Sequence, residues 1–203
     1  MTSGPFLFLR CVIRMDLFPA FLKLGGRPVL VVGAGPVAAS KLEALLRAGA
    51  QVTVVAPEVH PAIRAAGVRL EVRPYEPRDL AGVWFAVAAA TPEVNAAVAA
   101  DAERRQIFVN AVDDPANASV YLGGVVRRGG VTVAISTSGD APALAGLLRE
   151  GIDALLPAEL DRWSAQARAI RTDWKANGTP MHERRPQLLR ALAALYDTRD
   201  HTC

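Results

Sequence analysis

Residues 27–41 read RPVLVVGAGPVAASK, an apolar run that leads into two glycines and then into a stretch suited to a helix. Gly33 allows a tight turn at the strand end, and Gly35 lets the backbone approach a pyrophosphate. Ala38 is small enough for the helix to pack on the strand. A helix that opens at Pro36 offers unpaired N–H groups and the positive end of its dipole to phosphate. The stretch therefore predicts a dinucleotide-binding turn.

Apolar strands and amphipathic helices alternate after this turn. The expected strands are residues 51–55, 68–72, 83–89 and 107–109, and the expected helices between them are residues 60–66 and 93–104. The run at 83–89 is apolar throughout, which is typical of a central parallel strand covered by helices on both faces. The pattern predicts the α/β class, with a Rossmann-like doubly wound parallel sheet.

The pattern changes beyond Pro115. Two β-rich runs, 120–126 and 131–135, flank Arg127-Arg-Gly-Gly130, which predicts a small β-hairpin. A helix is expected next, with Asp140 as its N-cap and Pro142 in its first turn. Its apolar stripe comprises Leu144, Leu147, Leu148, Ile152 and Leu155. A hairpin and one helix make a poor core alone, so we expect this region to pack on a second copy of the chain.

The remaining residues predict a C-terminal helical segment. One helix is expected at 159–175, ending near Asn177-Gly178, and a last segment opens at Pro180 and is broken or kinked by Pro186. The predicted division of the chain is an N-terminal extension (1–14, with Met15 as the expected true start), an NAD-binding Rossmann domain (15–115), a dimerisation region (116–157) and the helical segment (158–203).

Composition narrows the classes of function. The chain has 203 residues, of which 51% are hydrophobic, and a net charge of +3, so it is expected to be globular. It shows no basic stripe with interleaved aromatics, as nucleic-acid binding would need, and no apolar run of the roughly 18 residues that span a membrane. The two cysteines stand near opposite ends and no metal-ligand spacing occurs, so we expect a cytoplasmic protein without a bound metal.

Several residues are expected to bind the cofactor: Gly33, Gly35, Pro36, Val37, Pro57, Glu58 and Thr91. The acidic residue that usually holds the ribose, about 20 positions after the first glycine, is missing from the second strand. Glu58 is the nearest carboxylate, and the adenosine is expected near Pro57 and Glu58. This rule therefore leaves the choice between NAD and NADP open.

The order of the motifs resembles the siroheme synthase N-terminal family of precorrin-2 dehydrogenases and sirohydrochlorin ferrochelatases, in stand-alone form. The resemblance rests on Met15-Asp-Leu-Phe-Pro-Ala-Phe, Val32-Gly-Ala-Gly-Pro-Val-Ala38, Asn110-Ala-Val-Asp113, Ala134-Ile-Ser-Thr-Ser-Gly-Asp-Ala-Pro142 with Leu147-Leu-Arg-Glu150, and Met181-His-Glu-Arg-Arg185. It implies a homodimer that oxidises precorrin-2 to sirohydrochlorin with NAD⁺. In bifunctional members Fe²⁺ is then inserted to give siroheme, and the sequence does not separate the two cases.

Asp113 is the candidate for catalysis. It follows the fifth strand at the edge where ligands bind, and the resemblance assigns its carboxylate to both activities. The alternative is an Asx turn or helix cap before Pro115. Ser136, Thr137, Ser138 and Arg149 are expected to meet substrate carboxylates, although the hydroxyls also suit helix capping. A competing interpretation of the whole chain is a Rossmann module that senses NAD without turning it over.

Overall fold

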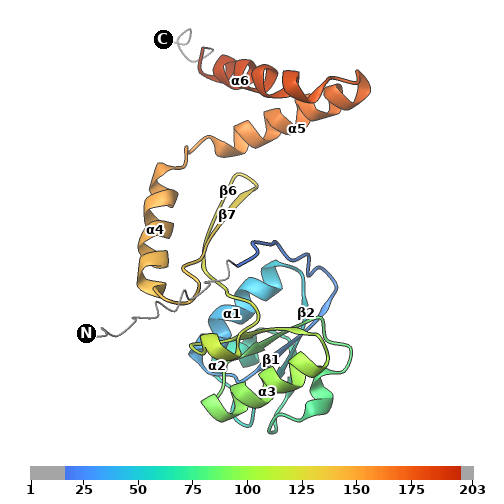
Figure 1. Cartoon of the computed structure of the whole chain (residues 1–203), viewed down its shortest axis with the longest axis vertical. Helices are drawn as coiled ribbons and strands as arrows, with labels where there is room; N and C mark the ends of the chain where they lie inside the picture. The colour runs from blue at the N-terminus through green and yellow to red at the C-terminus, as the bar shows by residue number, and fades with distance from the viewer. Residues whose placement is uncertain (1–16, 198–203) are drawn as a thin grey trace, which may run out of the picture. The chain divides into compact units, whose positions relative to one another are not determined.

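The computed structural model describes residues 17–197, so the predicted extension at residues 1–14 and the start at Met15 lie outside the described residues. The chain divides into two compact units between Val120 and Tyr121. In Figure 1 the first unit runs from blue to green and the second from yellow to red. Each unit is described by itself below.

The first unit is built around a parallel sheet. Its elements are β1 (Pro28–Val32), α1 (Pro36–Arg47), β2 (Gln51–Val55), α2 (Pro61–Ala65), β3 (Arg69–Glu71), the 3₁₀ turn η1 (Pro77–Leu80), β4 (Phe85–Ala88), α3 (Pro92–Arg104), β5 (Phe108–Ala111) and the 3₁₀ turn η2 (Pro115–Asn117). The strand order is β3-β2-β1-β4-β5, and every pairing is parallel. The predicted Rossmann-like sheet is confirmed.

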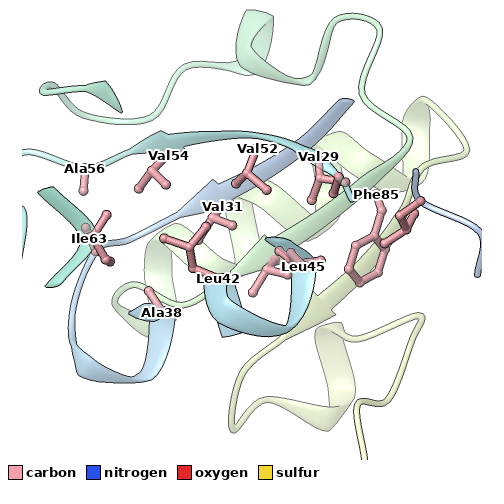
Figure 2. Close-up of a cluster of buried hydrophobic side chains, with 14 residues drawn as sticks. Val29, Val31, Ala38, Leu42, Leu45, Val52, Val54, Ala56, Ile63 and Phe85 are labelled. Carbon is pink, nitrogen blue, oxygen red and sulfur yellow. The ribbon is translucent and has the colours of Figure 1, made fainter. Parts of the chain in front are cut away.

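Helices on both faces explain why the strands are continuously apolar. On one face, β1 and β2 pack against α1 and α2, and on the other, β1, β4 and β5 pack against α3. Figure 2 shows Leu42 and Leu45 of α1 against the valines of β1 and β2. Four of the five β1 residues are buried, since alternate side chains enter opposite halves of this core.

The second unit consists of a hairpin and three helices. Its elements are β6 (Gly124–Arg128), β7 (Val131–Ile135), α4 (Pro142–Leu155), α5 (Leu160–Ala176) and α6 (Met181–Asp197). β6 and β7 pair antiparallel, and α4 packs closely on β6, where a Cβ at Gly124 would lie 3.0 Å from the carbonyl oxygen of Ala145. The predicted hairpin and the helices that follow it are present.

Two details of the second unit differ from the prediction. Arg127 and Arg128 belong to β6 rather than to the turn, because Gly129 and Gly130 both adopt positive φ, as a two-residue hairpin turn requires. The N-cap of α4 is Ala141 and not Asp140. The Thr137 hydroxyl accepts the N–H of that N-cap residue at 3.3 Å, and α4 begins without a side-chain capping bond.

Pro186 does not end the last helix. α6 runs from Met181 to Asp197 with this proline inside it. Pro186 stands in the second turn, close to the amino end, where few intrahelical bonds precede it. The helix continues past it without the hydrogen bond that an N–H at position 186 would donate to the carbonyl of His182.

Candidate functional site

Three segments leave the sheet side by side at its carboxyl edge. β1, β4 and β5 are neighbours in the sheet, and the N–H of Val112 still donates to the carbonyl of Ala88 at 2.9 Å just beyond β5. Gly33 follows β1 directly, Thr91 follows β4 and Asp113 follows β5. The structure thus brings these three predicted residues to the edge where open α/β sheets bind ligands.

The two glycines of the turn have different structural roles. Gly33 has φ +97°, and a Cβ there would lie 2.2 Å from the carbonyl oxygen of Ala89, so the fold itself requires this glycine. Gly35 has an ordinary φ of −82°, and a Cβ there would meet nothing within 4 Å. The space beside Gly35 is therefore available to a ligand, as the approach of a pyrophosphate to the backbone requires.

The amino end of α1 suits an anion. Gly35 is the N-cap and offers no side-chain capping bond, Pro36 is the first helical residue, and the first turn holds no acidic residue. The first N–H groups of the helix are thus left without side-chain partners, and the positive end of its dipole is not neutralised. Val37, which is 47% exposed, borders this end. These features fit a dinucleotide pyrophosphate.

The loop after β2 lies against the glycine turn. The N–H of His60 donates to the carbonyl of Ala34 at 2.9 Å, and the imidazole Nδ1 accepts the N–H of Ala62 at 3.2 Å. Pro57 and Glu58 precede this contact and are exposed. The loop carrying the nearest carboxylate is therefore fixed beside the expected phosphate position.

The segment between β4 and α3 is held by a buried asparagine. Asn95 is 4% exposed, and its Oδ1 accepts the N–H of Ala90 at 3.0 Å. Thr91 is the N-cap of α3 but makes no capping bond. The pKa of the Glu93 carboxyl is lowered by its own backbone N–H and by a hydrogen bond from the Thr91 hydroxyl. Thr91 is thus placed at the edge by Asn95 and engaged with Glu93.

Asp113 and Asp114 differ in the hydrogen bonds that their carboxylates make. Asp114 is the N-cap of η2, and its Oδ2 accepts the Nδ2 of Asn117 at 2.7 Å. Asp113 is exposed and has φ +56°, and its carboxylate makes no hydrogen bond or ion pair with any residue of the described range. The backbone of Asp113 forms part of the turn after β5, and its carboxylate is left available. Its catalytic role stays a prediction.

The charged cavity of the first unit lies along β1, β2 and β3 and reaches Val55 and Glu71, the last residues of β2 and β3. It has a volume of about 300 Å³ and reaches from Pro28 at the start of β1 to Arg69 and Arg73. Arg73 pairs with Asp79 at 2.6 Å and Arg69 pairs with Glu71 at 2.9 Å. Because the arginines are paired with carboxylates, the cavity has less uncompensated positive charge to bind an anion than the amino end of α1 has.

Residues 17–197 contain neither a cluster of metal ligands nor a membrane-spanning helix. No three His, Cys, Asp or Glu side chains of this range group so as to hold a metal ion. None of its helices is both long and apolar enough to cross a lipid bilayer.

Comparison with known proteins assigns the family. A sequence family described as "Putative NAD(P)-binding" matches residues 20–124, and one described as "Sirohaem biosynthesis protein central" matches residues 128–155. Siroheme synthase 3 of Aeromonas hydrophila subsp. hydrophila is 44% identical over 89% of this chain and 40% of its own length. The chain belongs to the siroheme synthase N-terminal family. The resemblance noted in the motifs is thus confirmed, as is an NAD(P)-binding first unit.

Two further relatives support membership of the siroheme synthase N-terminal family. Siroheme synthase 1 of Aeromonas salmonicida is 42% identical over 89% of this chain and 40% of its own length. The solved structure of SirC, described as a precorrin-2 dehydrogenase, is 26% identical with a TM-score of 0.68, over 86% of this chain and 88% of that one. The chain spans about 40% of the length of these two curated synthases, whereas it matches most of the SirC chain.

The residues expected to bind substrate lie in the second unit of this family member. Ser136, Thr137 and Ser138 join β7 to α4, where the Ser136 hydroxyl accepts the N–H of Ser138 at 3.1 Å and Thr137 accepts the N-cap N–H of α4. Two of the three hydroxyls thus also serve the turn. Arg149 on α4 donates to the adjacent Glu150 at 3.2 Å. Their contact with substrate stays a prediction.

Three residues at the site were not singled out from the sequence. Asn95 accepts the N–H of Ala90 in the segment before α3, and His60 donates its N–H to Ala34 in the glycine turn. The hydroxyl of Ser119 accepts the N–H of Val109 on β5. Asn95 gave a weak signal, since a polar residue occupies a buried helix position. Ser119 gave none, because its contact forms only when the chain returns to β5.

Proposed function

We propose that the chain is an NAD-dependent precorrin-2 dehydrogenase that oxidises precorrin-2 to sirohydrochlorin. Asp113 carries the proposal, because its carboxylate has no partner among residues 17–197. It follows β5, next to the strand β4 that leads to Thr91, and lies at the same sheet edge as the glycine turn. Membership of the family and the similarity to SirC support the choice of substrate.

The first unit is proposed to hold the cofactor. NAD⁺ supplies the hydride acceptor when it is bound. Gly35, Pro36 and Val37 would form the anion-binding end of α1. The backbone N–H groups of Gly35, Val37 and Ala38 would be the donors, since Pro36 has none and the N–H of Ala39 is bonded to the carbonyl of Gly35. Glu58 would accept hydrogen bonds from the ribose hydroxyls. Its charge would repel a 2′-phosphate, which favours NAD over NADP.

Asp113 is proposed to take the proton that leaves precorrin-2 as the hydride is transferred. An exposed carboxylate at the mouth of the crevice can pass this proton on to water. The same carboxylate would accept the pyrrole protons if Fe²⁺ enters sirohydrochlorin as a substrate. That second activity is a separate proposal, and it needs no preformed metal site.

A homodimer and a cytoplasmic location complete the proposal. The homodimer is supported by the stripe along α4, where Leu147 is 66% exposed and Leu155 is 83% exposed. A contiguous apolar surface of this kind commonly marks a protein interface. The contact of Ser136, Thr137, Ser138 and Arg149 with the carboxylates of the tetrapyrrole also belongs to the proposal.

The test is anaerobic incubation of the purified protein with enzymatically generated precorrin-2 and NAD⁺, followed in the visible spectrum. Formation of sirohydrochlorin that depends on NAD⁺ is the expected result. Binding of NAD⁺ without turnover would instead indicate a sensing module. Addition of Fe²⁺ afterwards tests the second activity, because a chelatase must incorporate the metal faster than the protein-free control.

A further inference from the structure

The loop that carries Asp113 is closed at its base by backbone bonds. After β5 the chain turns outward at residues 112–118 and returns at Ser119 and Val120, whose N–H groups both donate to the carbonyl of Val109, at 2.9 and 3.0 Å. β5 is the edge strand of the sheet, so the returning chain pairs with the side of β5 that faces away from β4. The two ends of the loop are thereby held together.

The side chain of Ser119 completes this closure. Its hydroxyl accepts the N–H of Val109 at 2.8 Å. Val109 is 3% exposed, so this N–H would otherwise be a buried donor without a partner on the outer side of β5. A serine is one of the few side chains short enough to accept an N–H while its own backbone pairs with the same residue.

Asn110 fixes the other side of the base. It is 7% exposed, and its Nδ2 donates to the carbonyl of Val120 at 2.9 Å. If the Asn110 amide were reversed, its Oδ1 would face the carbonyl oxygen of Val120. The bond from Nδ2 therefore fixes the orientation of the side chain. Its Oδ1 is buried and has no partner among the residues that the structure describes, which is a cost that an apolar side chain would avoid.

The rest of the loop is also held, apart from the carboxylate of Asp113. Val112 and Val120 pack against the hydrophobic core, and the N–H of Val112 donates to β4. Asp114 is bound to Asn117 within η2. The backbone of Asp113 adopts the left-handed conformation, which a non-glycine residue keeps only where its surroundings determine it. The closed base is thus part of what sets the direction of the carboxylate.

We propose that Ser119 and Asn110 are positioning residues, which close the loop and hold the carboxylate of Asp113 in its reactive place. The inference rests on the proposed function of Asp113 as proton acceptor. Neither side chain touches the substrate in this account. Both act through the backbone at 109–120, so their loss affects turnover by Asp113 and leaves the cofactor end of α1 intact.

The test compares Ser119→Ala, Ser119→Thr and Asn110→Leu with the unaltered protein. Ser119→Ala removes the acceptor for Val109 and should lower kcat at least about 10-fold, since small displacements of reacting groups cost rate steeply. The affinity for NAD⁺ should stay unchanged. Ser119→Thr keeps the hydroxyl at an exposed position and should restore kcat. Hydrogen exchange of the amides at 112–117 should quicken in Ser119→Ala and not in Ser119→Thr.

Asn110→Leu separates positioning from stability. It removes an unsatisfied buried acceptor at similar volume, so Tm should hold or rise, while the carbonyl of Val120 is released and kcat should fall. Should Ser119→Ala fail to fold, this variant still decides the matter. A wild-type kcat in Asn110→Leu or in folded Ser119→Ala overturns the inference.

Failure of the inference differs from failure of the proposed function. If the unaltered protein turns over precorrin-2 and Asp113→Asn does not, but Ser119→Ala keeps its kcat, the function stands and the positioning role falls. If the unaltered protein shows no turnover, the proposed function falls. Hydrogen exchange then still tests the closure, and unchanged exchange in Ser119→Ala overturns that as well.

Discussion

The two units of the chain bury their apolar residues to different extents. In the first unit β1 and β4 are buried almost completely between helices. In the described part of the second unit the buried apolar residues are Val126, Ala145 and Leu160, while the leucines along α4 are exposed. The first unit therefore has a core of its own and can fix the geometry of a site, whereas the second presents apolar surface that a further protein surface would cover.

The largest expected effect is on the stability of the first unit, and it tests whether that unit has a well-packed core of its own. Gly33→Ala adds a Cβ that would meet the carbonyl of Ala89 at 2.2 Å, at a φ of +97°. The free energy of unfolding should fall by about 3–5 kcal/mol or the unit should fail to fold, as measured by circular dichroism during thermal unfolding. Gly35→Ala is the matched control and should unfold as the unaltered protein does. Equal stability of the two variants would refute the assigned role of Gly33.

The next effect separates cofactor binding from folding within the first unit. Gly35→Asp places a negative charge in the open space beside the amino end of α1, where the pyrophosphate is proposed to bind. Affinity for NAD⁺ should fall about 100-fold by calorimetry, since like charges at a contact cost several kcal/mol, while Tm stays close to that of the unaltered protein. Gly35→Asn has the same size without the charge and should lose less. Equal losses in both variants would point to bulk rather than charge.

A smaller effect tests whether the exposed apolar surface of the second unit serves self-association. Leu147→Glu places a charge in the exposed stripe of α4 and should weaken self-association about 10-fold or more, because burying an unpaired charge at an interface is costly. Light scattering over a dilution series measures this, and NAD⁺ affinity should be unaffected. Ala169→Glu, at an exposed position of α5, is the control. A monomeric unaltered protein, or no change in Leu147→Glu, would contradict the proposed dimer.

The smallest effect concerns a contact that stabilises the first unit without serving its site. Two hydrogen bonds from Arg73 lower the pKa of the Asp79 carboxyl, in opposition to its burial. The Asp79 carboxylate therefore binds a proton more readily in the unfolded chain than in the folded one. The stabilisation is fully present above the unfolded pKa of about 3.9, and it is lost as pH falls through the lower folded value.

Asp79→Asn measures that contact. It should lower the free energy of unfolding by about 1–2 kcal/mol at neutral pH, as determined by urea unfolding. The difference should shrink as the pH falls from about 4 through the lower folded pKa of Asp79. Glu71→Gln is the control, because it removes the charge from the ion pair of Arg69 and Glu71, which is more exposed than the pair of Arg73 and Asp79. It should change the free energy of unfolding by under about 1 kcal/mol. A loss in Asp79→Asn that does not depend on pH would contradict the assignment.

The sequence predicted the first unit well because its signals are local. A parallel strand covered on both faces must be apolar along its length, as Val29–Val32 is, and Gly33 and Gly49 stand where the backbone needs positive φ. The hairpin after Pro115 was also predictable. β7 has the expected bounds, whereas β6 begins four residues later than expected and ends two residues later. The pair Gly129-Gly130 forms the whole turn, so Arg127 and Arg128 remain in β6.

The site could be predicted only in part, because its details depend on tertiary contacts. Only the motif Asn110-Ala-Val-Asp113 of the family resemblance distinguished Asp113 from Asp114, since the physical difference arises from the bond between Asp114 and Asn117 within η2. The closure by Ser119 forms only once the chain has returned to β5. The N-cap of α4 was assigned to Asp140, one residue too early, because the bond that Thr137 supplies is not visible as a capping sequence.

The central claim is that the unpartnered Asp113, and not the bonded Asp114, takes part in turnover. The most direct measurement compares Asp113→Asn and Asp114→Asn in anaerobic oxidation of precorrin-2 with NAD⁺, with NAD⁺ affinity measured in parallel. The account predicts that Asp113→Asn loses turnover by about 100-fold or more and binds NAD⁺ normally, while Asp114→Asn, which keeps an acceptor for Asn117, stays active. Full activity in Asp113→Asn would contradict the account.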